Sequence, residues 1–216
     1  SQRHVAKAMT RYVKDTGIRP DWLLLLGDNF YNDLGPLERL PLDRWTEGFE
    51  HMYPSGSFPG PCPAVLGNHD YLDWTDGPDL GTIATFLFID TNTRGINGFG
   101  PSFSAQDTHR IHLDGDEESE QWRWLAKQLA SPRGTFTCVV GHHPIFSNGM
   151  HGDHRDLIAT LAPLLRKHRV HFYLSAHDHD LQHLEIDPLP TSFILSGGGG
   201  AHQRPFARER HNAPFF

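Results

Sequence analysis

Four short apolar runs in this chain each end in a small residue that is followed at once by polar residues able to bind a metal ion. The four segments are Gly27-Asp28-Asn29-Phe30-Tyr31, Gly67-Asn68-His69-Asp70, Gly141-His142-His143-Pro144 and Ala176-His177-Asp178-His179. Short, continuous apolar runs are typical of buried parallel strands. The carboxyl ends of parallel strands meet at one edge of a sheet, where ligands bind. We therefore expect the four polar segments to lie close together in the fold.

The rest of the pattern alternates between the two kinds of secondary structure. Helical spacing is seen over residues 5–13, before Gly17, and over 42–53, 119–129 and 157–165. Strands are predicted over 21–26, 64–66, 82–90, 135–140, 170–175, 181–186 and 192–195. Such alternation predicts an α/β fold. The length of 216 residues fits one domain better than two.

Composition excludes several classes of function. The formal net charge of −7 argues against a broad nucleic-acid groove, which needs a basic surface. No apolar run is long enough to cross a bilayer. Cys62 and Cys138 form neither a zinc-type pair nor a disulfide framework, and we expect both to be small buried residues. The 16 histidines are the outlier, and they make the net charge strongly dependent on pH.

The polar segments carry a mixed set of metal ligands. Aspartate supplies oxygens that can bridge two ions, asparagine supplies a neutral oxygen, and imidazoles suit zinc, iron and manganese. A calcium site would be built of oxygen ligands alone. Each segment is weak support when it is taken alone, because a glycine-aspartate pair is usually a turn. Their order, and their positions after strands, make the set much more specific.

The four segments resemble, in order, the motifs GDxxY, GNH(D/E), GHxP and GHxH of the calcineurin-like metallophosphoesterase superfamily, except that Ala176 replaces the glycine of the last motif. Tyr31, in the first motif, points to the purple acid phosphatases, and the text LLLLGDNFY is similar to the small tartrate-resistant type. The resemblance covers residues 21–200. It implies an α/β fold in which a two-sheet β-sandwich, with a βαβαβ core, is flanked by helices. The metals would lie at the C-terminal strand ends.

The resemblance also implies a role for each matching residue. Asp28 would bridge the two metals. Tyr31 and His179 would bind a ferric ion, and Asn68, His142 and His177 would bind a divalent ion, which is Fe(II), Zn or Mn. His69 and His151 would contact the substrate phosphate, and His151 lies nine residues after His142, at the spacing seen in the small phosphatases.

The implied activity is that of an acid phosphatase, a metal-dependent phosphoric monoester hydrolase. Two adjacent Lewis acids would lower the pKa of a bound water and hold the phosphate oxygens. One of His69 and His151 would protonate the leaving alcohol. The implied partners are a small phosphate-ester substrate and inorganic phosphate, with no nucleic acid and no membrane span, in a monomer. The implied location is secreted, lysosomal or periplasmic.

Several alternatives stay open at the level of sequence. Tyr31 is either a ferric ligand or a rim residue over a two-zinc or two-manganese site. A phosphodiesterase or nucleotide pyrophosphatase would use the same metals, and a non-catalytic binding module is the third reading. Histidines outside the ligand set are expected to be neighbours, surface residues or supporting residues: His143, His154, His183, His202 and His211. Gly197–Gly200 is expected to form a tight turn near the metals. Trp122 and Trp124 are expected to serve helix packing and the surface rather than a base-stacking platform.

The chain departs from the family pattern in three main places. Members of the family begin with a strand that ends in an aspartate ligand of the ferric ion, whereas this chain opens at about the first helix. The segment near 74–81 is shorter than in relatives, and closing strands are expected after Phe216. We therefore expect residues 1–216 to be a single metallophosphoesterase domain that lacks the first strand, this loop and the C-terminal strands. If the aspartate is truly absent, the non-catalytic reading gains support.

Overall fold

The computed structural model describes residues 2–29, 49–65, 67, 84–92, 115–200 and 202–207. Its elements, in chain order, are α1 (Gln2–Thr16), β1 (Ala84–Phe88), α3 (Gly115–Ala130), β2 (Phe136–Val140), α4 (Arg155–Lys167), β3 (Phe172–Ser175), β4 (Leu181–Glu185) and β5 (Ser192–Ser196). Helices and strands are interleaved along the chain. The α/β class predicted from the alternating pattern is therefore confirmed.

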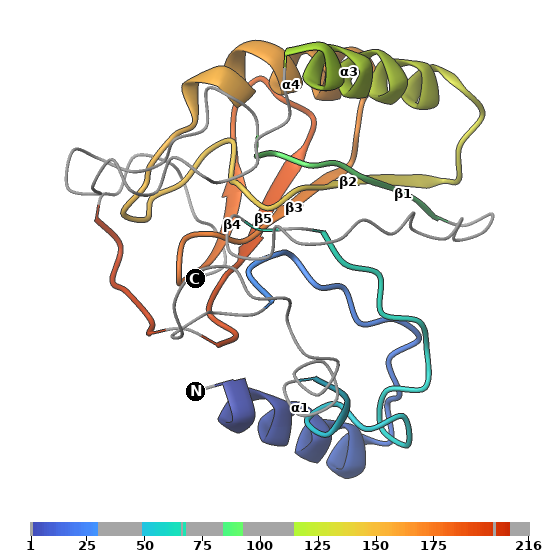
Figure 1. Cartoon of the computed structure of the whole chain (residues 1–216), viewed down its shortest axis with the longest axis vertical. Helices are drawn as coiled ribbons and strands as arrows, with labels where there is room; N and C mark the ends of the chain where they lie inside the picture. Colours follow the sequence, from blue (N-terminus) through green and yellow to red (C-terminus); the bar gives the residue numbers. More distant parts are fainter. Residues whose placement is uncertain are drawn as a thin grey trace.

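The five strands form one sheet in the order β1-β2-β3-β5-β4 (Figure 1). The pairs β1–β2, β2–β3 and β3–β5 are parallel, whereas β4 runs antiparallel to β5 at one edge. The loops that follow β1, β2 and β3 consequently leave the sheet at the same edge. The loops after β2 and β3 carry two of the four polar segments that the sequence placed at strand ends.

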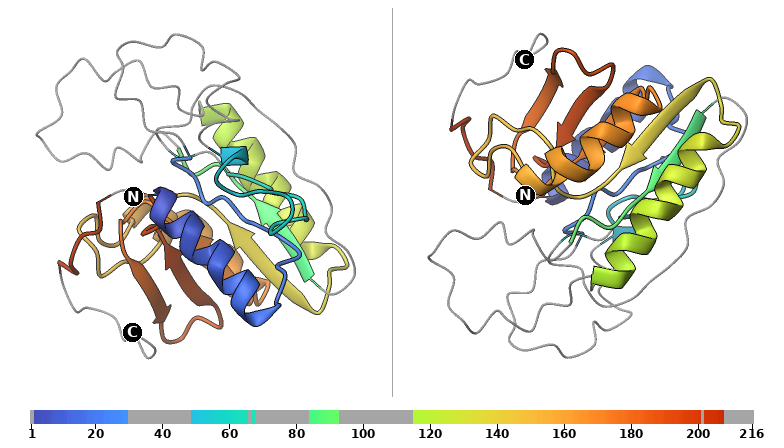
Figure 2. Two further views of the ribbon diagram at one scale, coloured as in Figure 1. Left: turned by 90° about the horizontal axis from the view of Figure 1, so that it is seen from below. Right: turned by 90° about the horizontal axis from the view of Figure 1, so that it is seen from above.

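Helices cover both faces of the sheet. Helices α3 and α4 lie over one face and α1 lies over the other, as the views from below and from above show (Figure 2). Between the sheet and α3/α4 lies the main apolar core, in which Leu125, Leu161 and Leu165 have no exposed surface. On the opposite face a smaller cluster contains Val65, Cys138 and Val140. A central sheet flanked by helices, as expected, thus holds the strand ends in place.

Two predicted strands in the N-terminal half are much shorter than expected. The runs 21–26 and 64–66 meet only as a parallel bridge between Leu25 and Ala64. The Leu25 amide donates to the carbonyl of Pro63, and the Val65 amide donates to that of Leu25, at 3.0 and 2.9 Å. Within the described residues there is one multi-stranded sheet and this bridge, so the second sheet of the sandwich stays a prediction. The predicted helix over 42–53 falls largely outside the described residues.

The first helix ends where its sequence predicts. Helix α1 stops at Thr16, and the amide of Gly17 donates to the carbonyl of Val13 at 3.0 Å. Ala6 and Val13 are buried on its inner face. Cys138 is buried as predicted, whereas Cys62 is only half-buried. None of the helices in the described ranges is both long and apolar enough to span a membrane.

Candidate metal centre

The structure describes five of the eight predicted site residues, and four of these five lie in the strand-end segments. Asp28 follows the Leu25–Ala64 bridge, His142 follows β2, and His177 and His179 follow β3. His151 lies in the loop between β2 and α4. The other three predictions, Tyr31, Asn68 and His69, lie outside the described residues.

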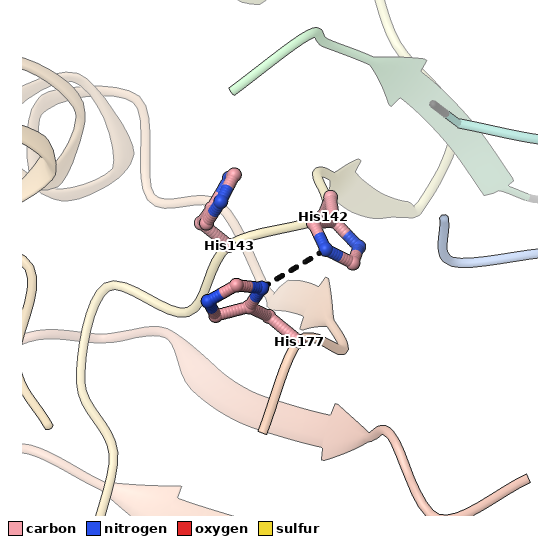
Figure 3. Close-up of side chains that lie close together, drawn as sticks. All are labelled: His142, His143 and His177. Atoms are coloured by element: carbon pink, nitrogen blue, oxygen red, sulfur yellow. Dashed lines mark hydrogen bonds between the residues drawn. The ribbon is translucent and has the colours of Figure 1, made fainter. Parts of the chain in front are cut away.

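Three ligand atoms from three separate turns converge on one point. His142 Nε2 lies 3.3 Å from Asp28 Oδ1. It lies 3.1 Å from His177 Nδ1, the contact drawn as a dashed line in Figure 3. Two ligands that each bind one zinc ion at about 2.0–2.1 Å, in a tetrahedral arrangement, are about 3.3 Å apart. The observed spacing therefore fits a shared ion. The donor set of one carboxylate and two imidazoles suits a transition metal.

The orientation of His142 also fits a role as a metal ligand. Its Nδ1 lies 2.9 Å from the carbonyl oxygen of Leu26, which accepts only if Nδ1 carries the proton. This tautomer directs the lone pair of Nε2 toward Asp28 and His177. Metal-binding histidines usually donate their other ring N–H to such a carbonyl or to a carboxylate.

Burial favours the neutral form of these imidazoles. His142 is fully buried and His177 is 9% exposed. Burial, followed by repulsion from His143 and His142, lowers the pKa of His177 well below its ordinary value. The Nε2 atom of His177 is buried and has no hydrogen-bond partner within the described residues. Leaving this buried nitrogen without a partner is costly, and it is not the nitrogen that faces His142, which is Nδ1.

His143 is closer to the centre than the sequence suggested. Its side chain is buried, its ring centroid lies 4.5 Å from that of His177, and its Nδ1 lies 2.9 Å from Thr91 Oγ1. One ligand atom from each of His142, His143 and His177 lies within 4.8 Å of the others. Sequence analysis treated His143 only as a neighbour of His142. The doubled histidine in Gly141-His142-His143-Pro144 was the available signal.

Two glycines let the turns approach one another closely. Gly27 has a φ of 91°, and a Cβ there would collide with His142 Nδ1 and lie 2.7 Å from the amide nitrogen of Gly67. A Cβ on Gly67 would collide with the amide nitrogen and Oδ1 of Asp28. Asp28 and His177 themselves have left-handed φ values of 53° and 66°. Such conformations are uncommon in residues other than glycine and cluster at functional sites.

A buried polar network holds His151 beside the imidazole cluster. His151 Nδ1 and its backbone amide lie 2.6 and 3.1 Å from Asp178 Oδ1, while Ser147 Oγ lies 2.5 Å from Asp178 Oδ2. The His151 ring centroid is 4.2 Å from that of His177. Burial raises the pKa of Asp178, but the hydrogen bonds from His151 and Ser147 outweigh it and the net pKa is lowered. Asp178, which sequence analysis did not single out, therefore stays charged and fixes the His151 ring.

An open cavity of about 660 Å³ gives access to the centre. Asp28, His142, His177 and His179 line it, together with Arg3 near the start of α1. The Nδ1 atom of His179 lies 3.2 Å from the carbonyl oxygen of His202. Burial, followed by repulsion from Arg204, lowers the pKa of His179. The cavity has room for a small ligand next to the ligand atoms.

The remaining histidine and tryptophan predictions agree with the structure where it describes them. His154 caps α4 by accepting from the Leu157 amide, and His183 lies at the exposed edge strand β4 beside Glu185. Trp122 packs on the main core, whereas Trp124 is 41% exposed. His211 lies outside the described residues. In the described part of the chain, these side chains have structural or surface positions, as expected.

Comparison with known proteins identifies the family. The model of the calcineurin-like phosphoesterase family matches residues 2–181. Tartrate-resistant acid phosphatase type 5 of Homo sapiens is 30% identical over 234 residues, which cover 97% of this chain and 69% of that protein. Purple acid phosphatase 7 of Arabidopsis thaliana is 30% identical over 83% of this chain and 60% of its own length. The chain belongs to the calcineurin-like phosphoesterase family, and its relatives at this identity are tartrate-resistant and purple acid phosphatases.

A solved structure supports the fold. GAP50, described as the anchor in the inner membrane complex of Plasmodium, superposes with a TM-score of 0.70 and 23% identity. The match covers 98% of this chain and 71% of that one. At this identity the likeness concerns the architecture alone. The family uses a metal centre, and the buried histidine cluster is a place where this chain could hold one.

Proposed function

We propose that this protein hydrolyses phosphate monoesters at a binuclear metal centre of the Fe(III)–M(II) type, where M is Fe, Zn or Mn. The observation that carries the proposal is the position of His142 Nε2, which lies 3.3 Å from Asp28 Oδ1 and 3.1 Å from His177 Nδ1. Purple acid phosphatase relatives support hydrolysis of phosphoesters. The finer claims, two ions and monoester substrates, rest on the motif resemblance together with this geometry.

In this proposal each matching residue has one role. Asp28 bridges the two ions, His142 and His177 hold the divalent ion with Asn68, and Tyr31 holds the ferric ion with His179. When bound, the ions supply Lewis-acid chemistry that activates water and draws charge from the phosphate oxygens. The chain's contribution is to keep its imidazoles neutral, buried and correctly oriented.

His151 is the described residue best placed to act on the substrate. Asp178 holds its Nδ1, which leaves Nε2 for the phosphate or the leaving oxygen. The side chain is 25% exposed, so solvent and substrate can reach it. A carboxylate that orients an imidazole is a common arrangement for a general acid or base. We assign this role to His151, with His69 as a second phosphate contact.

The proposal is tested by metal analysis and turnover of para-nitrophenyl phosphate. His142→Ala should lose the divalent ion and lower kcat/KM by more than about 100-fold, because even outer-sphere partners of metal ligands cost 10–100-fold. His151→Ala should keep its metal content but lower kcat by about 100-fold or more. The matched control is His183→Ala, a histidine outside the centre, which should stay within about two-fold of the wild type.

Three results separate the alternatives. A violet band that disappears in Tyr31→Phe would support the ferric assignment, whereas a colourless, active zinc or manganese protein would remove it. Faster turnover of bis-para-nitrophenyl phosphate than of the monoester would favour a phosphodiesterase. If the metal-replete protein turned over neither ester between about pH 4 and 8, the non-catalytic reading would replace the proposal.

A further inference from the structure

A stripe of positive charge runs along the exposed side of α1. Arg3, Lys7, Arg11 and Lys14 recur at spacings of four, four and three residues, which places them on one side of a helix. All four are exposed, and the only acidic residue of α1 is Asp15. Within the described residues none of the four forms an ion pair. This local charge contrasts with the net charge of −7 for the whole chain.

The stripe borders a grooved surface. A cavity of about 270 Å³ is lined by Arg3 and Lys7 together with His51 and Met52. A second cavity, of about 480 Å³, is lined by three cations and one carboxylate, Lys7, Arg11, Lys14 and Asp15, and again by His51 and Met52. Because Lys7, His51 and Met52 border both cavities, they are neighbouring parts of one groove between α1 and the segment 51–54. We call it the α1 groove.

The α1 groove shares one lining residue, Arg3, with the cavity at the candidate metal centre. Arg3 lines the cavity of about 660 Å³ that contains Asp28, His142 and His177, and it also lines the first cavity of the α1 groove. From Arg3 to Lys14 the helix rises 1.5 Å per residue, or about 16 Å. An extended peptide rises about 3.3 Å per residue, so this length matches about five residues.

We propose that the α1 groove binds an acidic peptide segment that flanks the phosphorylated residue of a protein substrate. This inference rests on the proposed phosphatase function, since it names the substrate class of that same centre. Glutamate or aspartate side chains of the segment would pair with Lys7, Arg11 and Lys14 while the phosphoryl group reaches the cavity next to His142. Electrostatic complementarity of this kind sets specificity and association rate.

The geometry favours a peptide over other anions. A small polyphosphate is too short to span about 16 Å of helix. A membrane surface is flat, whereas these cations border concave cavities. A long nucleic acid would also meet the negative charge of the rest of the chain.

The test compares acidic and neutral phosphopeptides in the metal-replete protein. Phosphoserine peptides carry four glutamates on the amino or the carboxyl side, and their counterparts carry four glutamines. Each exposed ion pair between the peptide and the groove contributes about two-fold to kcat/KM. For the peptide whose glutamates lie on the side that enters the groove, we therefore expect kcat/KM to be about ten-fold higher than for its glutamine counterpart, mainly through a lower KM. The preference should disappear at about 0.5 M salt, where surface charges are screened.

Paired variants locate the effect. Lys7→Gln/Arg11→Gln/Lys14→Gln should reduce the acidic-to-neutral ratio of kcat/KM by about five-fold, and glutamine preserves helix propensity. The matched control removes three exposed cations from the opposite layer of the molecule: Arg123→Gln/Lys127→Gln/Lys167→Gln. It should leave the ratio unchanged. Circular dichroism and thermal unfolding show whether both variants are folded.

Each outcome bears on one claim. The groove proposal is overturned, while the phosphatase function stands, if the wild type turns over para-nitrophenyl phosphate but does not prefer acidic peptides. It is also overturned if the acidic-to-neutral ratio of kcat/KM falls as much in the control variant as in the α1 variant. Stronger inhibition by a 20-nucleotide single strand, or by phosphatidylserine vesicles, than by the unphosphorylated acidic peptide would also overturn it. If no ester is turned over at all, the function fails, and fluorescence anisotropy of the labelled acidic peptide still tests the groove.

Discussion

Gly67→Ala should disable the candidate metal centre through a single added methyl group. In the native fold, Gly67 lies against the turn that carries Asp28. A Cβ at Gly67 would lie 2.8 Å from Asp28 Cγ and would collide with the Asp28 amide nitrogen and Oδ1, whereas ordinary contacts are 3.4–4 Å. The Asp28 carboxylate must therefore move by at least about 0.6 Å, and the backbone of one turn must move with it.

A shift of this size is large for the chemistry that we propose. Asp28 Oδ1 lies 3.3 Å from His142 Nε2, a spacing that fits a shared ion and that a displaced carboxylate would not keep. Misplacement by about 1 Å can cost about 100-fold in rate. We expect Gly67→Ala to lose bound metal on dialysis and to lower kcat/KM for para-nitrophenyl phosphate by about 100-fold. Overpacking should lower the free energy of unfolding by about 1–3 kcal/mol.

The control is Gly56→Ala, where the added Cβ would meet nothing within 4 Å. It should keep its metal content and stay within about two-fold of the wild-type activity, because surface substitutions are usually mild. Both variants are measured by elemental analysis, turnover and urea unfolding. Full metal content and near-wild-type turnover in Gly67→Ala would refute the argument that the two turns must touch to form the site.

Three further predictions concern stability and are measured by urea unfolding. Leu161→Ala, at a fully buried core position, should cost about 3 kcal/mol. Tyr173→Phe should cost about 1–2 kcal/mol, because the carbonyl of His143 loses the hydroxyl donor 2.7 Å away, whereas exposed Tyr12→Phe should be nearly neutral. Burial lowers the pKa of His154 in the folded protein. The stability that its neutral ring contributes is therefore complete above about pH 6.5 and is lost as pH falls toward the folded pKa. The free energy of unfolding of His154→Asn should equal that of the wild type at pH 8 and exceed it at pH 5.5.

Local sequence signals predicted most of the helices and strands in the described part of the chain. Helix α4 has an apolar repeat through Leu157, Leu161 and Leu165, and all three are buried against the sheet. The length of the strand predicted at 21–26 was overestimated. An apolar run indicates that a segment is buried, but it does not show how many of its residues pair with a neighbouring strand. In the structure only Leu25 forms a bridge there. Pairing is a property of the whole fold, so a single segment cannot reveal it.

The candidate site was predicted as a set of ligands but not as a network. Asp28, His142 and His177 were recognisable because each follows an apolar run, and the parallel strands then bring them together. Asp178 was missed because its importance lies in contacts with His151 and Ser147, which are 27 and 31 residues away in sequence. Tyr31, Asn68, His69, the one-domain boundary and the secreted or lysosomal location stay predictions.

The candidate metal ligands in the described part of the chain show how a site that costs folding free energy can still have a fixed geometry. His177 is buried, neutral and left-handed in φ, and its Nε2 has no partner among the described residues. Each of these features opposes folding, so packing elsewhere must compensate for them. The compensation is close at hand, since β2 and β3 end in the buried residues Val140 and Ser175 immediately before the ligand turns. The turns at this sheet edge hold His142 Nε2 and His177 Nδ1 3.1 Å apart, and a spacing fixed by the fold is what a preorganised metal site requires.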